Sequence, residues 1–159
     1  MNNFRKKYLS QILGTVLLVF ALILGYFEYQ RINIENSLVP LGDYYDYSIL
    51  LYVGHWFLYV ILFLTSIVTI FKLKASSFFL ILFGLGSLLE FYFNINIYII
   101  PSMTESQQHI LLVLGIISLI FGFLNLLEIK KISFTEIILA ISLAFGIIYL
   151  PNGLITFYF

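Results

Sequence analysis

The stretch that decides the fold is residues 78–99, FFLILFGLGSLLEFYFNINIYI. It holds a single charged residue, Glu90, in an otherwise mostly apolar run. Crossing the hydrocarbon core of a bilayer takes about 20 predominantly apolar residues, so this run is long enough to span. The rest of the chain has the same character, with 62% of its 159 residues hydrophobic and only 10% charged. Soluble domains carry about 25% charged residues, so the composition predicts an integral membrane protein.

Four other segments also have the length and composition of a span. The five predicted spans are residues 8–27, 48–71, 78–99, 109–127 and 133–150. Backbone polar groups in lipid must be satisfied within the segment, so each span should be a helix. A transmembrane barrel would instead show alternating strands of about ten residues. We therefore expect an all-α membrane protein, a compact bundle of five transmembrane helices that forms one domain over residues 1–159.

The basic residues predict the orientation of this bundle. Seven of the eight precede the first span or lie in the second–third and fourth–fifth connections: Arg5, Lys6, Lys7, Lys72, Lys74, Lys130 and Lys131. Cytoplasmic segments carry the excess of lysine and arginine, so we expect a cytoplasmic N-terminus and an extracytoplasmic C-terminus. No cleavage site follows the first span, which we interpret as a retained signal anchor in a prokaryotic plasma (inner) membrane.

Several function classes are disfavoured by what the sequence lacks. It contains no cysteine, which removes thiolate metal sites and thiol nucleophiles. Its formal net charge is zero, so it has no electrostatic footprint for nucleic acid. It has no HExxH, Gly-x-Ser-x-Gly, P-loop or GxGxxG motif. We expect no catalysis, no cofactor, no metal site and no nucleic-acid partner.

Glu90 and His55 are predicted to lie at similar depth. Glu90 is about 12–13 Å from the outer end of its span, and His55 is about 10 Å from the outer end of the preceding one. The two spans are antiparallel and joined by a short turn, so they should be neighbours. Each residue shares a helix face with polar residues of its own span, namely Tyr52 and Tyr59 with His55, and Ser87 and Asn94 with Glu90. A charge in the membrane is costly, so we expect Glu90 to face protein and to be paired with His55 or protonated.

Three interpretations of this polar cluster remain open. It could fix the register of two packed helices, since interhelical polar contacts specify packing. It could be a protonatable pair that responds to pH or to an ion. It could also line a binding site for a lipid, a quinone or a hydrophobic peptide.

The predicted outer loop, residues 28–47, is acidic and rich in tyrosine. It is either an ordinary interfacial loop with tyrosines at headgroup level or a docking surface for an extracytoplasmic partner. The residues that would form the docking surface are Glu35, Asp43, Tyr44, Tyr45 and Asp46.

Taken together, the sequence predicts a small non-enzymatic polytopic membrane protein that acts by association. It would serve as an accessory or regulatory subunit of a membrane complex, or as an immunity- or resistance-type protein. The alternative is a small proton- or ion-coupled transporter or channel subunit that uses the Glu90–His55 pair. Five helices leave little room for a pore, so transport would imply a homo-oligomer. The expected partners are membrane lipid and either another membrane protein or further copies of the chain.

Overall fold

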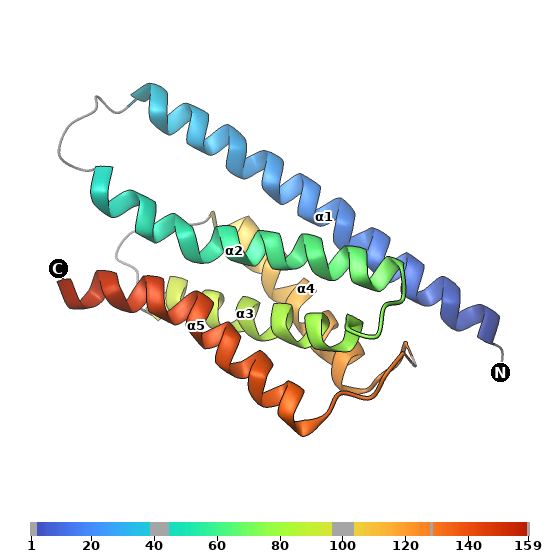
Figure 1. Cartoon of the computed structure of the whole chain (residues 1–159). Helices are drawn as coiled ribbons and strands as arrows, with labels where there is room; N and C mark the ends of the chain where they lie inside the picture. The colour runs from blue at the N-terminus through green and yellow to red at the C-terminus, as the bar shows by residue number, and fades with distance from the viewer. Residues whose placement is uncertain (1–2, 39–44, 97–103, 128, 159) are drawn as a thin grey trace.

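A computed structural model of the chain describes residues 3–38, 45–96, 104–127 and 129–158. These residues form five helices and no strand (Figure 1). The helices are α1 (Asn3–Leu38), α2 (Tyr45–Ile70), α3 (Ser76–Asn96), α4 (Glu105–Phe123) and α5 (Phe134–Tyr158). The predicted all-helical class is confirmed.

Three helices contain a segment that is long and apolar enough to cross a membrane: Tyr8–Gln30 in α1, Ser76–Phe93 in α3 and Glu105–Phe123 in α4. Among the residues whose side chains the structure describes, the apolar segments of α2 and α5 are Trp56–Ile70 and Phe134–Tyr149. Large apolar side chains are exposed on all five helices, as Ile12, Val60 and Ile141 illustrate. Soluble monomers rarely expose so much contiguous apolar surface, so the chain has the surface of a membrane protein.

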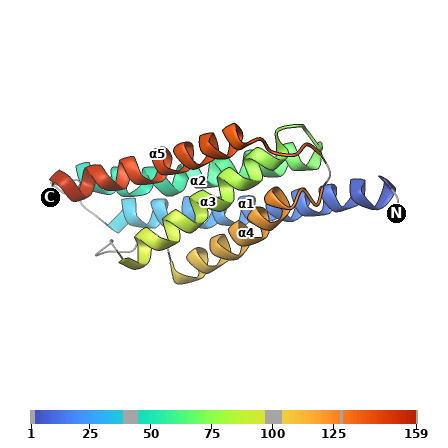
Figure 2. The same cartoon turned by 90° about the horizontal axis from the view of Figure 1, so that it is seen from below.

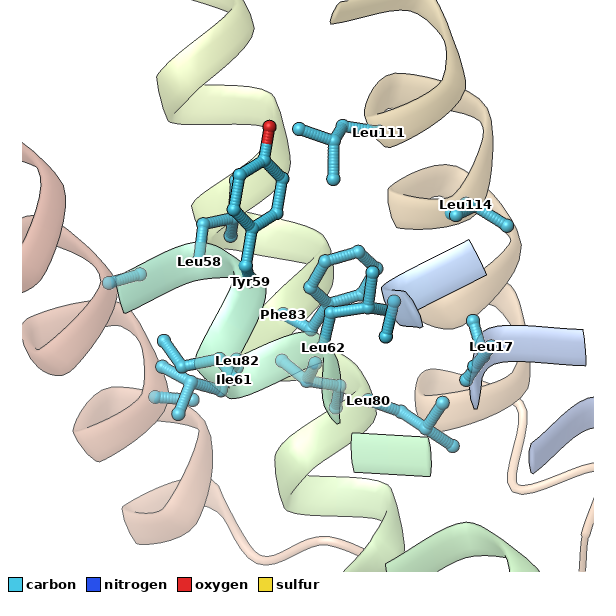
Figure 3. Close-up of a cluster of buried hydrophobic side chains, with 14 of the residues drawn as sticks. Leu17, Leu58, Tyr59, Ile61, Leu62, Leu80, Leu82, Phe83, Leu111 and Leu114 are labelled. Atoms are coloured by element: carbon cyan, nitrogen blue, oxygen red, sulfur yellow. The ribbon is translucent and has the colours of Figure 1, made fainter. Parts of the chain in front are cut away.

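The centre of the bundle is α3, which packs against α2, α4 and α5. Helix α2 packs in addition against α1 and α5, so α1 is joined to the bundle mainly through α2. The N-terminus and the C-terminus lie at opposite ends of the bundle in two perpendicular views (Figures 1 and 2). Leu17, Leu62 and Phe83 are fully buried where α1, α2 and α3 meet (Figure 3).

Helix α1 meets α2 along one face of small, apolar and polar residues. A Cβ atom added to Gly14 would come within 2.6 Å of the backbone nitrogen of Ile70, so the two backbones cross in close contact there. Nearby, the hydroxyl of Ser10 donates a hydrogen bond to the carbonyl oxygen of Thr69. The buried residues of this face follow three-and-four spacing: Ser10, Leu13, Gly14, Leu17, Ala21, Leu24 and Glu28.

Helices α3 and α4 also cross through small residues. A Cβ on Gly84 would lie 2.7 Å from the carbonyl oxygen of Gly115, and a Cβ on Gly115 would lie 2.6 Å from the Cβ of Ser87. Further along, a Cβ on Gly122 would lie 3.2 Å from the carbonyl oxygen of Ser77. Small residues let helix backbones approach closely where no hydrophobic force drives helices together in lipid.

The helix ends carry specific capping structures. Helix α2 ends in a Schellman motif, in which Leu73 N–H donates to Val68 O at 2.9 Å and Lys72 N–H donates to Thr69 O at 3.1 Å. Lys72 takes the left-handed position of that motif, with φ of 52°. Helix α4 begins with a capping box between Thr104 and Gln107, four residues before the predicted start of its span.

The prediction of an outer loop over residues 28–47 is wrong at both ends of that range. Helix α1 continues to Leu38 and α2 begins at Tyr45, so both ends of the predicted loop are helical. The reason lies in the sequence, because residues 28–38 contain no proline or glycine and the helix breakers Pro40 and Gly42 come only after them. Helix α5 likewise continues past the predicted end of its span to Tyr158.

Candidate intramembrane polar site

Glu90 is buried in the centre of the bundle, with 2% of its surface exposed. It lies one helical turn beyond Ser87, which is also buried on α3. The Ser87 hydroxyl donates to the carbonyl oxygen of Phe83 at 2.9 Å, so it bonds within its own helix. Together with its contact to Gly115, this makes Ser87 a packing residue of the α3–α4 crossing.

The register of α2 against α3 is set by three contacts. The Thr65 hydroxyl bonds to Ile61 O at 2.6 Å and also lies 3.2 Å from Phe79 O of α3. The Ser76 hydroxyl lies 2.7 Å from Val68 O and 2.6 Å from Leu73 O, and it shares one proton between them. The third contact is between Gly86 and Leu58, whose Cδ1 would lie 3.0 Å from an added Cβ. In each pair the two residue numbers add to 144.

The same register puts residue 54 of α2 opposite Glu90, next to His55 in the chain. The two residues are therefore at similar depth along the backbones of α2 and α3. The side chains of His55, Tyr52 and Asn94 lie outside the described residues, and the pairing of Glu90 with His55 stays a prediction.

Tyr59 is a buried member of the predicted cluster whose side chain the structure describes. It is buried on α2, and its hydroxyl points toward Leu111 of α4 (Figure 3). Leu111 is itself buried. Tyr59 thus extends from α2 into the interior of the bundle, in the part of α2 that also contains His55.

Glu28 is a second buried carboxylate, and it was not predicted from the sequence. The predicted outer loop began at this residue, but the structure has it inside α1 with 4% of its surface exposed. The indole N–H of Trp56 on α2 donates to Glu28 Oε1 at 3.2 Å. The signal that could have found it is the spacing of the α1 face, which continues from Ala21 and Leu24 to Glu28 in steps of three and four.

The two buried carboxylates lie at one level of the bundle. Glu28 bonds to residue 56 of α2, and Glu90 lies opposite residue 54. Two residues along a helix span about 3 Å. Helices α1 and α3 both pack on α2, so the two acids flank the same short stretch of that helix. An ionisable residue inside a membrane bundle is a functional-site candidate by default, and here there are two.

His109 also lies close to this level, on α4. Its ring packs edge-on against Phe91, the residue after Glu90, with ring centroids 6.1 Å apart. Its Nδ1–H donates to the carbonyl oxygen of Glu105 at 2.7 Å, which assigns the proton to that nitrogen. Among the described residues no group of three or more His, Cys, Asp or Glu side chains could hold a metal ion.

The residues of the predicted docking surface are divided between helices and undescribed chain. Glu35 belongs to α1, and Tyr45 and Asp46 belong to the first turn of α2, but their side chains lie outside the described residues. Asp43 and Tyr44 lie outside the described residues altogether.

Comparisons with protein-family models, with curated proteins and with solved structures find no match. Two structural features of this chain bear on its function: the buried acids beside α2 and the long helical ends of α1 and α2.

Proposed function

We propose that the chain is an integral membrane protein with five spanning helices, which acts without catalysis by association with another membrane protein. Helices α2 and α5 are also long enough for this arrangement. Helix α2 has 26 residues and α5 has 25, which correspond to about 39 Å and about 37 Å of helix. The hydrocarbon core is about 30 Å thick, so both helices can cross it.

The proposed orientation has the N-terminus in the cytoplasm of a prokaryotic plasma membrane. The start of α1, the α2–α3 turn and the α4–α5 connection lie at the same end of the bundle (Figure 1). These are the segments that contain seven of the eight basic residues. Cytoplasmic connections are enriched in lysine and arginine, which supports this end as the inner one.

The observation that carries the association function is the length of α1. The helix has 36 residues, or about 54 Å, and its apolar segment ends at Gln30. Residues 31–38 continue it as a polar helix beyond the hydrophobic part, and α2 begins again at Tyr45. Glu35, Tyr45 and Asp46 are thereby part of helical backbone, and a segment that is already helical loses less conformational freedom when it binds a partner. This fits an accessory or regulatory subunit, or an immunity-type protein.

Purification in mild detergent tests the association. A partner protein should be recovered with the native chain in a fixed ratio and lost from the double variant Glu35→Gln/Asp46→Asn. Glu105→Gln is the matched control, because Glu105 is an exposed acid in the first turn of α4 and lies outside the proposed surface. Recovery of the native chain alone, or equal recovery of the partner with the double variant, would contradict the proposal.

A second candidate function is proton- or ion-coupled transport by a homo-oligomer. The observation that favours it is the burial of Glu28 and Glu90 at one level of the bundle. In proteoliposomes, Glu28→Gln and Glu90→Gln should each abolish a pH-gradient-driven flux that Glu105→Gln leaves intact. If the acids only fix helix packing, the wild-type protein will carry no such flux, and Glu90→Leu will be as stable as the native chain or more so.

A further inference from the structure

Three segments that are far apart in the sequence meet at the end of the bundle where the chain begins. The hydroxyl of Ser10 in α1 bonds to Thr69 O near the end of α2. The hydroxyl of Ser77 in α3 donates to the carbonyl oxygen of Lys130, in the α4–α5 connection, at 3.1 Å. These bonds hold the α2–α3 turn beside the α4–α5 connection, as Figure 2 also shows. Lysines from the two connections therefore share one surface.

Most of the positive charge on this surface is not neutralised by acids of the described chain. Lys130 forms an ion pair with Glu136, with 2.7 Å between Nζ and Oε1. No acid among the described residues pairs with Lys72, Lys74 or Lys131. Lys74 and Lys131 are exposed and Lys72 is partly exposed. The other acid of this region, Glu128, lies outside the described residues.

Exposed apolar side chains lie directly beside these lysines. Phe71 and Leu73 alternate with Lys72 and Lys74 along the α2–α3 turn, and 69% of Phe71 is exposed. At the start of α5, 77% of Phe134 is exposed. A headgroup-level site needs both properties, because apolar rings enter the acyl region while lysine stems carry the ammonium groups outward to the phosphates.

We propose that this basic end of the bundle binds the phosphate groups of acidic phospholipids through Lys72, Lys74 and Lys131. Acidic lipids are favoured over zwitterionic ones because they retain a net negative charge beside the ammonium groups. A basic residue near an anionic membrane surface contributes about fivefold to binding. The proposal depends on the chain being in a membrane, but it is independent of the partner or the transport activity proposed above.

The test uses vesicles made from equal parts of phosphatidylglycerol and phosphatidylcholine. The reconstituted protein is released into mild detergent, and the retained lipids are counted by native mass spectrometry. The native chain should retain phosphatidylglycerol over phosphatidylcholine by about fivefold or more. The triple variant Lys72→Gln/Lys74→Gln/Lys131→Gln should lower this ratio severalfold. The four basic residues that remain at this end, Arg5, Lys6, Lys7 and the Glu136-paired Lys130, should leave a smaller preference.

Two control variants test whether the lipid preference depends on the location and on the charge of these lysines. Arg31→Gln removes the one basic residue outside this end and should leave the lipid ratio unchanged. The triple variant with arginine at the three lysine positions keeps the charge and should keep the preference. If the glutamine variant does not fold, 0.5 M NaCl added to the native protein should reduce the preference by screening. Equal retention of both lipids by the native chain, or a preference that salt and the glutamine substitutions leave unchanged, would overturn the proposal.

Discussion

The indole N–H of Trp56 donates to the buried carboxylate of Glu28, and this hydrogen bond joins α1 to α2 at the level of Glu90. Glu28 was predicted to begin a loop, but it is buried in the interior of the bundle. Trp56 itself is 43% exposed, so its ring faces outward on one side while its N–H reaches inward. Tryptophan often takes this position, with one part apolar and the other bonded to a polar group.

Replacing Trp56 with Phe should weaken the attachment of α1. The substitution removes the donor to Glu28 Oε1 and leaves the aromatic bulk in place. Interhelical polar contacts in membranes contribute about 0.6 kcal/mol on average and at most about 1.7 kcal/mol, and we expect a loss in this range. Reversible unfolding in mixed micelles measures it. In a double-mutant cycle with Glu28→Leu, a coupling energy of zero would contradict the hydrogen bond.

Gly14 and Gly25 form a matched pair for testing the α1–α2 crossing. A Cβ on Gly14 would meet the backbone nitrogen of Ile70 at 2.6 Å, whereas a Cβ on Gly25 would have nothing within 4 Å. Gly14→Ala should therefore cost about 1–3 kcal/mol because the backbones must separate. Gly25→Ala should be neutral or slightly stabilising, since alanine is the better helix former. Thermal unfolding of the two variants in the same detergent compares them, and equal midpoints would argue against the close crossing.

The α3–α4 crossing gives a second comparison within one fold. Gly84→Ala would bring a Cβ to 2.7 Å from Gly115 O, whereas a Cβ added to Gly146 of α5 would have nothing within 4 Å. We expect Gly84→Ala to lower the unfolding midpoint and Gly146→Ala to leave it close to the native value. Cysteine cross-linking between α3 and α4 provides an independent readout, because the native chain contains no cysteine. A cross-linking rate that Gly84→Ala leaves unchanged would count against the proposed contact.

The substitution Lys72→Gly should increase the free energy of unfolding of the protein. Its φ of 52° is in the left-handed region, which costs an L-residue with a Cβ about 1–2 kcal/mol and glycine nothing. Glycine loses more backbone entropy on folding, by about 0.5–1 kcal/mol, so the net gain from Lys72→Gly should lie between about 0 and about 1.5 kcal/mol. Chemical unfolding measures it, with Lys74→Gly as a control that should show no gain. A destabilised Lys72→Gly variant would mean that the lysine side chain contributes more than its backbone strain costs.

The prediction of Glu90 at the depth of His55 was possible because both sit in long apolar runs joined by a short turn. In that situation, distance along the chain translates directly into depth, and the backbone register agrees with residue 54 opposite Glu90. The packing role of Ser87 could not be predicted from the sequence. Its helical spacing from Glu90 suggested a shared polar face, but its hydroxyl bonds to Phe83 O and its Cβ fills the contact with Gly115.

The sequence by itself determined that this chain is helical and has the apolar surface of a membrane protein, because hydropathy is a sum over neighbouring residues that needs no tertiary contact. Only the tertiary structure decided that Glu28 is interior. Its position depends on α1 continuing as a helix past the apolar segment and on the register that the close crossing at Gly14 imposes against α2. A register between two helices comes from atoms far apart in the chain, so the composition of either helix alone does not contain it.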